Sequence, residues 1–141
     1  MTFEELRRLA KQTNWEKSRL LFILLKKTLE LLHEDDYLNG YVRHLFNDEN
    51  DELELYILSI KDKLFVTKYL YETKSTQITV YDVADIGHVR LTETADGEKE
   101  LLIPFSNGDV VRLNSRENYD HEHKNFVVDF ARDLISSRSM T

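Results

Sequence analysis

Six short segments rich in β-branched and aromatic residues follow one another between Leu53 and Leu113, and this succession limits the possible folds more than any other feature of the chain. Turn residues separate the segments, among them Asp96-Gly97 and Asn107-Gly108, which are typical of tight hairpins. Strands joined by such short turns pair in antiparallel order. The pattern therefore predicts an antiparallel meander of six strands, over residues 53–60, 64–71, 76–83, 86–93, 99–105 and 110–113.

Apolar and polar residues alternate in the last three segments, as expected for strands with one covered face. Pro104 has no N–H to give to a strand ladder, so its strand is predicted to lie at a sheet edge or to contain a bulge there. The residues expected on the shared apolar face are Val89, Leu91, Leu101, Ile103, Phe105, Val111 and Leu113.

The closing segment predicts an amphipathic helix from about His123 onward. Its apolar residues recur at i, i+1, i+4, i+5, i+8 and i+9, which is helical spacing. A helix stripe and a sheet face both need cover, so we expect this helix to pack against the open end of the sheet. The stripe consists of Phe126, Val127, Phe130, Ala131, Leu134 and Ile135.

At the other end of the chain, Thr2 and Glu5 have the spacing of a capping box and predict a first helix. This short helix is amphipathic. Its apolar side consists of Phe3, Leu6, Leu9 and Ala10, and its basic side consists of Arg7, Arg8 and Lys11.

Asn14 is a plausible cap for a second helix, from Trp15 to about Leu32. Its apolar residues extend too far around the helix for a single neighbour, so we expect it to be buried on two sides. Two arrangements would achieve this. Either the first helix and the rest of the domain enclose it, which we favour, or a second copy of the protein supplies the extra cover. The apolar residues are Trp15, Leu20 to Leu25, Leu29, Leu31 and Leu32.

The segment from residue 36 to residue 47 fits two structures. Asn39-Gly40 is a hairpin turn signal and favours a first strand from Tyr41 to Asn47. Six apolar residues at helical spacing favour a helix, and we predict a helix on that count. They are Tyr37, Leu38, Tyr41, Val42, Leu45 and Phe46.

The stretch from Val80 to Leu91, followed by Glu100 to Leu113, resembles the bacterial pleckstrin-homology-like (PH-like) domains. In that family an aromatic-Asp/Ser-x-x-Ile element joins two strands, a glycine-containing hairpin follows, and a C-terminal helix plugs one end of a half-open barrel. The residues that carry the resemblance are Tyr81, Asp82, Ile86 and Val89 for the first element, Ser106 to Asp109 for the second, and Asn125 to Ser136 for the third.

The resemblance covers roughly residues 53–138 and implies a PH-like antiparallel β-meander or half-barrel that a C-terminal helix caps. Together with the N-terminal helices predicted above, which it does not cover, the expected fold is α+β. A chain of 141 residues is typical of one domain. We therefore expect a single domain over residues 1–141, with a helical part at 1–46 and the PH-like part at 53–138. The lipid-binding eukaryotic relatives carry several basic residues in the first hairpin loop, whereas this chain has only Lys61 and Lys63 beside an aspartate. Binding of a lipid head group is therefore not implied.

Composition argues against several kinds of chemistry. Because the chain has no cysteine, it has no disulfide, thiolate zinc site, iron–sulfur cluster or cysteine nucleophile. No phosphate-binding loop or metalloprotease motif is present. The longest apolar run, Leu20 to Leu25, is far shorter than the roughly 20 residues of a membrane span, and no export signal is visible. We expect a cytoplasmic protein with no cofactor, no catalytic residues and no enzymatic activity.

His121 and His123 are the strongest candidates for metal ligands, with Asp120 or Glu122 as a third ligand. On a helix, however, residues two apart point about 200° away from each other. We therefore interpret this segment as a helix start, in which Asp120 is the N-cap and Glu122 a first-turn carboxylate, and we predict no metal site.

Charge is divided unevenly along the chain. Residues 1–27 carry a balance of +4, which leaves −11 for the remainder of a chain whose net charge is −7. An acidic run, Asp48 to Glu54, would repel a phosphate backbone, so nucleic acid is not an expected partner.

These observations favour a protein-interaction module, adaptor-like or self-associating as a homodimer. One alternative is attachment to an anionic membrane surface through Arg7, Arg8 and Lys11. The other is an acidic inhibitor or immunity-type protein that uses Asp48 to Glu54 against a basic partner. Tyr69 and Tyr71 lie on one face of a predicted strand and fit an interface and a plain cover for the sheet equally well.

Overall fold

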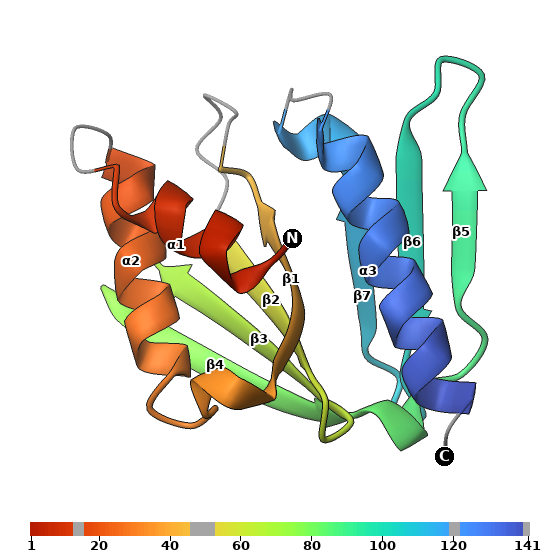
Figure 1. Ribbon diagram of the computed structural model, residues 1–141, viewed down its shortest axis with the longest axis horizontal. Coiled ribbons are helices and arrows are strands. Elements are labelled where there is room, and N and C mark those ends of the chain that lie inside the picture. Colours follow the sequence, from red (N-terminus) through yellow and green to blue (C-terminus); the bar gives the residue numbers. More distant parts are fainter. Residues whose placement is uncertain (13–15, 46–52, 119–121, 140–141) are drawn as a thin grey trace.

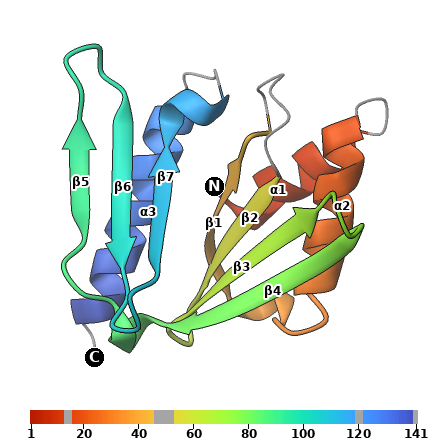
Figure 2. The ribbon, with the colours of Figure 1, turned by 180° about the vertical axis from the view of Figure 1, so that it is seen from behind.

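The computed structural model describes residues 1–12, 16–45, 53–118 and 122–139. Within these ranges the fold is α+β, as predicted, with two N-terminal helices, two antiparallel sheets and a C-terminal helix (Figures 1 and 2). The sheets contain β1 to β4 and β5 to β7, each in sequence order, and they do not close into a barrel. The helices are α1 (Phe3–Ala10), α2 (Glu16–Thr28) and α3 (Glu122–Ser139), and the strands are β1 (Tyr37–Arg43), β2 (Glu54–Ser59), β3 (Lys63–Leu70), β4 (Ser75–Asp82), β5 (Arg90–Glu93), β6 (Lys99–Pro104) and β7 (Val110–Asn114).

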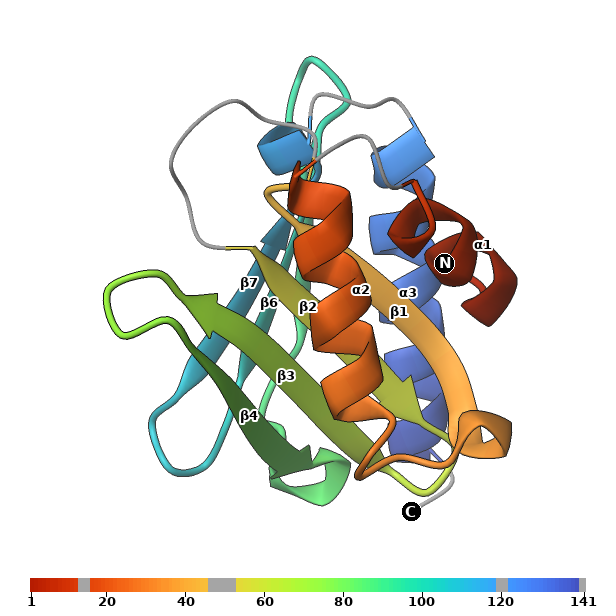
Figure 3. The same ribbon diagram turned by 90° about the vertical axis from the view of Figure 1, so that its left-hand side faces the viewer.

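The four-stranded sheet is the central layer and is covered on both faces. Helices α1 and α2 lie on one face, and α3 with the three-stranded sheet lies on the other (Figures 1 and 3). Strand β2 shows the result: Leu55 and Ile57 join the apolar cluster under α1 and α2, while Tyr56 and Leu58 join the cluster around α3. Because both faces are buried, this segment is almost continuously apolar in sequence.

All six predicted strands after Leu53 are present, each within one or two residues of the predicted start, except β5, which begins at Arg90 rather than at residue 86. The C-terminal helix is also confirmed, and it packs against β1 and β6. Two members of the predicted apolar faces are exposed, however. Leu91 lies on edge strand β5, and Ile135 lies on a side of α3 that neither sheet covers.

The helix predicted within residues 36–47 is wrong, and the N-terminal part at residues 1–46, predicted as helical, contains a strand in addition to α1 and α2. Residues 37–43 form β1, which pairs antiparallel with β2. The apolar residues match helical spacing by coincidence, because the strand is buried on both faces: Tyr41 belongs to the α3 cluster and Val42 to the α1/α2 cluster. The alternative prediction of a strand is confirmed, but the strand begins at Tyr37, four residues before the predicted start at Tyr41.

Gly40 illustrates why this strand tolerates a residue that weakens strands in general. The Tyr37 side chain crosses over Gly40, and its hydroxyl donates a hydrogen bond to the Met1 carbonyl at 2.8 Å. A side chain at position 40 would overlap the tyrosine hydroxyl. Glycine therefore lets Tyr37 tie the start of α1 to β1.

Gly40→Ala is expected to lower the free energy of unfolding by about 1–3 kcal/mol, because the new methyl group displaces Tyr37 from its hydrogen bond. Urea denaturation would measure the change. The matched control is Gly87→Ala, where the added carbon would find its nearest neighbours at 3.6 Å or more, and we expect little change there. Equal losses in the two variants would contradict this account of Gly40.

The capping box of Thr2 and Glu5 is present, with both reciprocal hydrogen bonds. Helix α2 packs against the sheet on one side and against α1 on another, so the intramolecular arrangement covers two of its sides. It ends at Thr28, four residues before the predicted end. The Thr28 hydroxyl there contacts both the Leu24 carbonyl and the Thr67 hydroxyl at 2.7 Å. Residues Asn14 and Trp15, predicted as its cap and first residue, lie outside the described residues.

Pro104 lies in the central strand of its sheet, so the prediction of an edge position is wrong, and no register shift marks a bulge at this position. It is the last residue of β6 and lies beyond the part of the strand that β5 pairs. Its carbonyl accepts a hydrogen bond from the Gly87 N–H at 2.8 Å. A strand end tolerates proline in the middle of a sheet because few ladder bonds remain to be made there.

Candidate functional site

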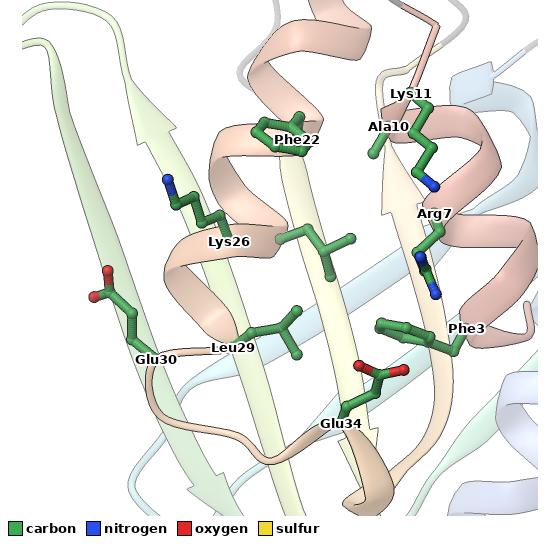
Figure 4. A pocket seen from close by; sticks show the side chains of 10 residues that line it. Phe3, Arg7, Ala10, Lys11, Phe22, Lys26, Leu29, Glu30 and Glu34 are labelled. Atoms are coloured by element: carbon green, nitrogen blue, oxygen red, sulfur yellow. The ribbon is translucent and has the colours of Figure 1, made fainter.

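A groove of about 440 Å³ lies between α1 and α2 on the outer side of the molecule (Figure 4). This volume falls within the range of roughly 300–1,000 Å³ that is usual for ligand pockets. Its walls are mainly apolar and are contributed by Phe3 and Ala10 from α1, by Phe22 and Leu25 from α2, and by Leu29 just after α2.

The groove exists because α1 covers only one flank of α2. The residues of α2 that face the sheet are fully or almost fully buried, among them Leu21, Leu24 and Leu25. Phe22 and Ile23 point away from the sheet and are 50% and 41% exposed. Because α1 has only eight residues, it cannot cover this whole outer side. The apolar stripe that is too broad for one neighbour is therefore only partly buried.

Charged residues divide the rim of the groove into two ends. Figure 4 shows Lys11 and Lys26 towards the Phe22 end, Glu30 and Glu34 towards the Leu29 end, and Arg7 between Lys11 and Phe3. Of the three basic residues, Lys11 and Lys26 make no ion pair within 4 Å among the described residues. The groove thus combines an apolar floor with a basic end and an acidic end.

Contacts made by residues of α1 hold one wall of the groove in place. The Phe3 ring packs edge-to-face on Tyr37, with 5.3 Å between ring centroids. The Arg7 guanidinium lies 5.7 Å from the centre of the Phe3 ring, and its Nη1 lies 3.4 Å from a carboxylate oxygen of Glu4. Phe3 and Arg7 are therefore positioned before anything binds.

The residues predicted from sequence as binding candidates do not gather at one place. Arg7 and Lys11 line the groove, whereas Arg8 is exposed and does not. Tyr69 and Tyr71 make an edge-to-face contact at 5.0 Å near the end of β3, and neither of them lines the groove. Tyr69 packs against the apolar cluster under α1 and α2, while Tyr71, just past the strand, is exposed.

Other groove residues were not singled out from the sequence as binding residues. Phe22, Leu25 and Leu29 belonged to the over-wide stripe of the second helix, and that stripe was the signal that could have located them. Lys26, Glu30 and Glu34 gave no comparable signal, because charged residues are ordinary on the exposed side of a helix.

A second concave feature, a cleft of about 340 Å³, lies between the inner face of the four-stranded sheet and β7. Arg43, Glu54, Lys68 and Gln77 form a row across this face, because the register places each opposite the next. A carboxylate oxygen of Glu54 lies 3.0 Å from Arg43 Nη1, and the other lies 3.3 Å from Lys68 Nζ. The Tyr56 hydroxyl also donates a hydrogen bond to Glu54.

The surroundings of Glu54 and Tyr56 move the pKa values of both side chains away from neutral pH. Burial on its own would raise the pKa of Glu54, but the hydrogen bond from Tyr56 and the charges of Arg43 and Lys68 outweigh it and lower the pKa. Burial, reinforced by the Glu54 charge, raises the pKa of Tyr56. Glu54 therefore stays ionised and Tyr56 stays protonated near pH 7, so neither exchanges a proton readily at that pH.

Several residues of the sequence predictions fall outside the described structure. These are Asp120, His121, the side chains of Glu122 and His123, and Asp48, Glu49, Asp51 and Glu52 of the acidic run. Within the described ranges, no three His, Cys, Asp or Glu residues gather in a way that could hold a metal ion. Glu54, the last acid of the run, is directed into the protein, where it pairs with Arg43 and Lys68.

None of the described helices is both long and apolar enough to cross a membrane. Comparison with known proteins found no matching family model, no matching curated protein and no matching solved structure. The class established by the coordinates is an α+β protein of two antiparallel sheets with helices on both sides of the larger one.

Proposed function

We propose that this chain is a non-enzymatic protein-interaction module that holds an amphipathic helix of a partner protein in the groove between α1 and α2. The observation that carries the proposal is the exposed Phe22 in an apolar groove whose two ends have opposite charge. Helix-in-groove recognition uses these features, since apolar anchors on one side of the bound helix fill the groove and charges at its rim set the orientation.

The charges of the groove specify the chemistry and direction of the bound helix. Helices favour acidic residues in the first turn and basic residues in the last turn, because these complement the helix dipole. Such a helix would place its N-terminal end beside Lys11 and Lys26 and its C-terminal end beside Glu30 and Glu34. The partner segment is therefore an amphipathic helix with acids at its start and two or more large apolar residues on one side.

We further propose that residues 53–138 form a PH-like domain, to which α1, α2 and β1 are joined. The succession of antiparallel strands β2 to β7 in two sheets, followed by a C-terminal helix, supports this assignment. A fold of this kind does not define a function by itself, so the interaction role rests on the groove.

The polar row supports the non-enzymatic part of the proposal. An efficient general acid or base has a pKa near the operating pH. The pKa values of Glu54 and Tyr56 are instead shifted away from neutral pH, so that Glu54 is held ionised and Tyr56 is held protonated. Their contacts suit a stabilising network at the end of the sheet.

The two alternative functions have less support. Insertion of α1 into a membrane would need its apolar side, but Leu6 is fully buried and Ala10 is 4% exposed. An inhibitor that used the acidic run would have to do so without Glu54, whose carboxylate is already paired with two cations.

Phe22→Ala is expected to weaken binding of the partner helix at least about tenfold, which corresponds to about 1.4 kcal/mol. The free energy of unfolding should change by less than about 1 kcal/mol, because Phe22 is half exposed. The probe is a displayed library of amphipathic helical peptides, from which binders of the whole protein are selected and their dissociation constants measured by titration.

Ile60→Ala is the matched control, because Ile60 is 55% exposed but lies in the β2–β3 turn, outside the groove. Selected peptides should carry acids in the first turn, and their affinity should fall with Phe22→Ala and with Lys26→Glu but not with Ile60→Ala. The proposal fails if no peptide is selected, if the control has the same effect as Phe22→Ala, or if anionic vesicles bind the protein while helices do not.

A further inference from the structure

Strand β4 is the least protected edge among the described strands. It is eight residues long, pairs only with β3, and keeps an unbroken register from Asp82 to Ser75. Natural sheets protect their edges with charged residues, proline, bulges, short strands or a covering element. The seven residues from Ser75 to Tyr81 contain no charge and no proline, and no bulge interrupts them.

The other three edges carry such protection. Helix α3 packs against β1, and the Gly40 N–H of β1 donates to the Met1 carbonyl at 3.2 Å. Strand β5 has only four residues, and both of its ends, Arg90 and Glu93, are charged. Strand β7 has five residues with Arg112 at its centre. The contrast shows that the open backbone of β4 is a local feature of this edge.

We propose that β4 pairs antiparallel with β4 of a second copy, which joins the two four-stranded sheets into one continuous sheet. An antiparallel strand pair is compatible with a two-fold axis perpendicular to the sheet, so one edge can serve both copies. Residues opposite each other must then face the same side of the sheet, which restricts the register to pairs whose numbers are both even or both odd.

One register of this kind brings complementary side chains together. With Ile78 opposite Ile78 of the second copy, Thr76 faces the second copy's Val80, and the paired residues from Ser75 to Tyr81 bring no like charges together. Cross-strand side-chain pairs of this kind stabilise a sheet. Val80 is 46% exposed in the single chain, and the second copy would cover it.

The contact area limits the strength of this dimer. Pairing one edge strand buries less surface than the roughly 1,200–2,000 Å² of a stable interface. We therefore expect a dimer that dissociates in the micromolar range, about 1–100 µM. This inference does not depend on the helix-binding groove, which is formed by residues of α1, α2 and the segment after α2.

Sedimentation equilibrium of the whole chain across that concentration range tests the proposal. The wild type should pass from monomer to dimer, while Val80→Lys should stay monomeric because lysine on an edge strand opposes pairing. Leu91→Lys is the matched control: Leu91 has similar exposure but lies on β5, and the dimer should be unchanged.

Hydrogen exchange of the wild type gives a second test that needs no variant. Backbone amides of β4 that point away from β3 should become more protected as protein concentration rises, while amides of β5 should not change. The proposal is overturned if the wild type remains monomeric throughout, or if Leu91→Lys disrupts the dimer and Val80→Lys does not. It is also overturned if the amides whose protection rises with concentration all lie outside β4.

Discussion

Glu54→Ala is expected to lower the free energy of unfolding by about 3–5 kcal/mol, which is the usual cost of removing one partner from a buried ion pair. The variant would leave Arg43, Lys68 and the Tyr56 hydroxyl around an empty position at the end of the four-stranded sheet. The loss should be large because the Glu54 side chain is only 11% exposed, so water cannot easily replace the carboxylate. Urea denaturation followed by circular dichroism would measure it.

Glu100→Ala is the control for this prediction, since Glu100 also pairs with an arginine on a neighbouring strand. Its carboxylate lies 3.9 Å from Arg112 Nη1, and its side chain is 39% exposed, so we expect a loss of less than about 1 kcal/mol. Similar losses for the two variants would show that the row of charges adds no more than ordinary surface pairs.

The acid dependence of stability should follow from the same contacts. The pKa of Glu54 is lower in the folded protein than its ordinary value of 4.5. The stabilisation from its ionised form is therefore present above about pH 4.5 and is lost as the pH falls through the folded-state pKa. In Glu54→Gln this part of the acid dependence should be absent. An identical slope of unfolding free energy against pH in the variant and the wild type would contradict the assignment.

Phe130→Ala should have a comparably large effect, a loss of about 3–5 kcal/mol, because it empties a large volume in the middle of a core. Phe130 is fully buried on α3, in a cluster that takes residues from both sheets, such as Tyr41 from β1 and Leu101 from β6. It is therefore central to the attachment of α3 to the two sheets. Thermal and urea unfolding should both report the loss.

Ile135→Ala is the matched control on the same helix. Ile135 has the same helical spacing in the sequence as the buried residues, but it is 49% exposed. We expect a change of less than about 1 kcal/mol. If Ile135→Ala proved as destabilising as Phe130→Ala, the orientation of α3 on the sheets would have to be different from the one described.

Local patterns were sufficient for most of the fold. Turn pairs such as Asp96-Gly97 and Asn107-Gly108 marked the hairpins, and the spacing from Thr2 to Glu5 marked the start of α1. The repeat that includes Val127, Phe130 and Leu134 marked α3. Each of these signals lies within about ten residues of the structure that it predicts, so no knowledge of the rest of the chain was needed.

Tertiary contacts explain the errors. The Tyr41 and Val42 side chains point to opposite faces of β1, and both are buried because different layers cover the two faces of the sheet. The sequence pattern of such a strand imitates a helix. The exposure of Leu91 and Ile135 also depended on how far neighbouring elements reach, which a local pattern does not contain.

The candidate site was predictable only in part. The breadth of the apolar stripe in the second helix already showed that one neighbour could not cover it, and Arg7 and Lys11 were noted as basic residues of the first helix. The groove itself depends on the short length of α1 and on its placement beside α2, so its floor and its division into a basic and an acidic end became visible only in three dimensions (Figure 4).

The sequence by itself determined the α+β class, the strands after Leu53 and the two terminal helices, because alternation, turn chemistry and helical spacing act over short distances. Only the tertiary structure decided that β1 is a strand, that Glu54 is enclosed by two cations, and that Phe22 remains exposed beside a groove. Each of these depends on which distant segments pack together, and the local sequence pattern does not show which distant segment covers a given residue.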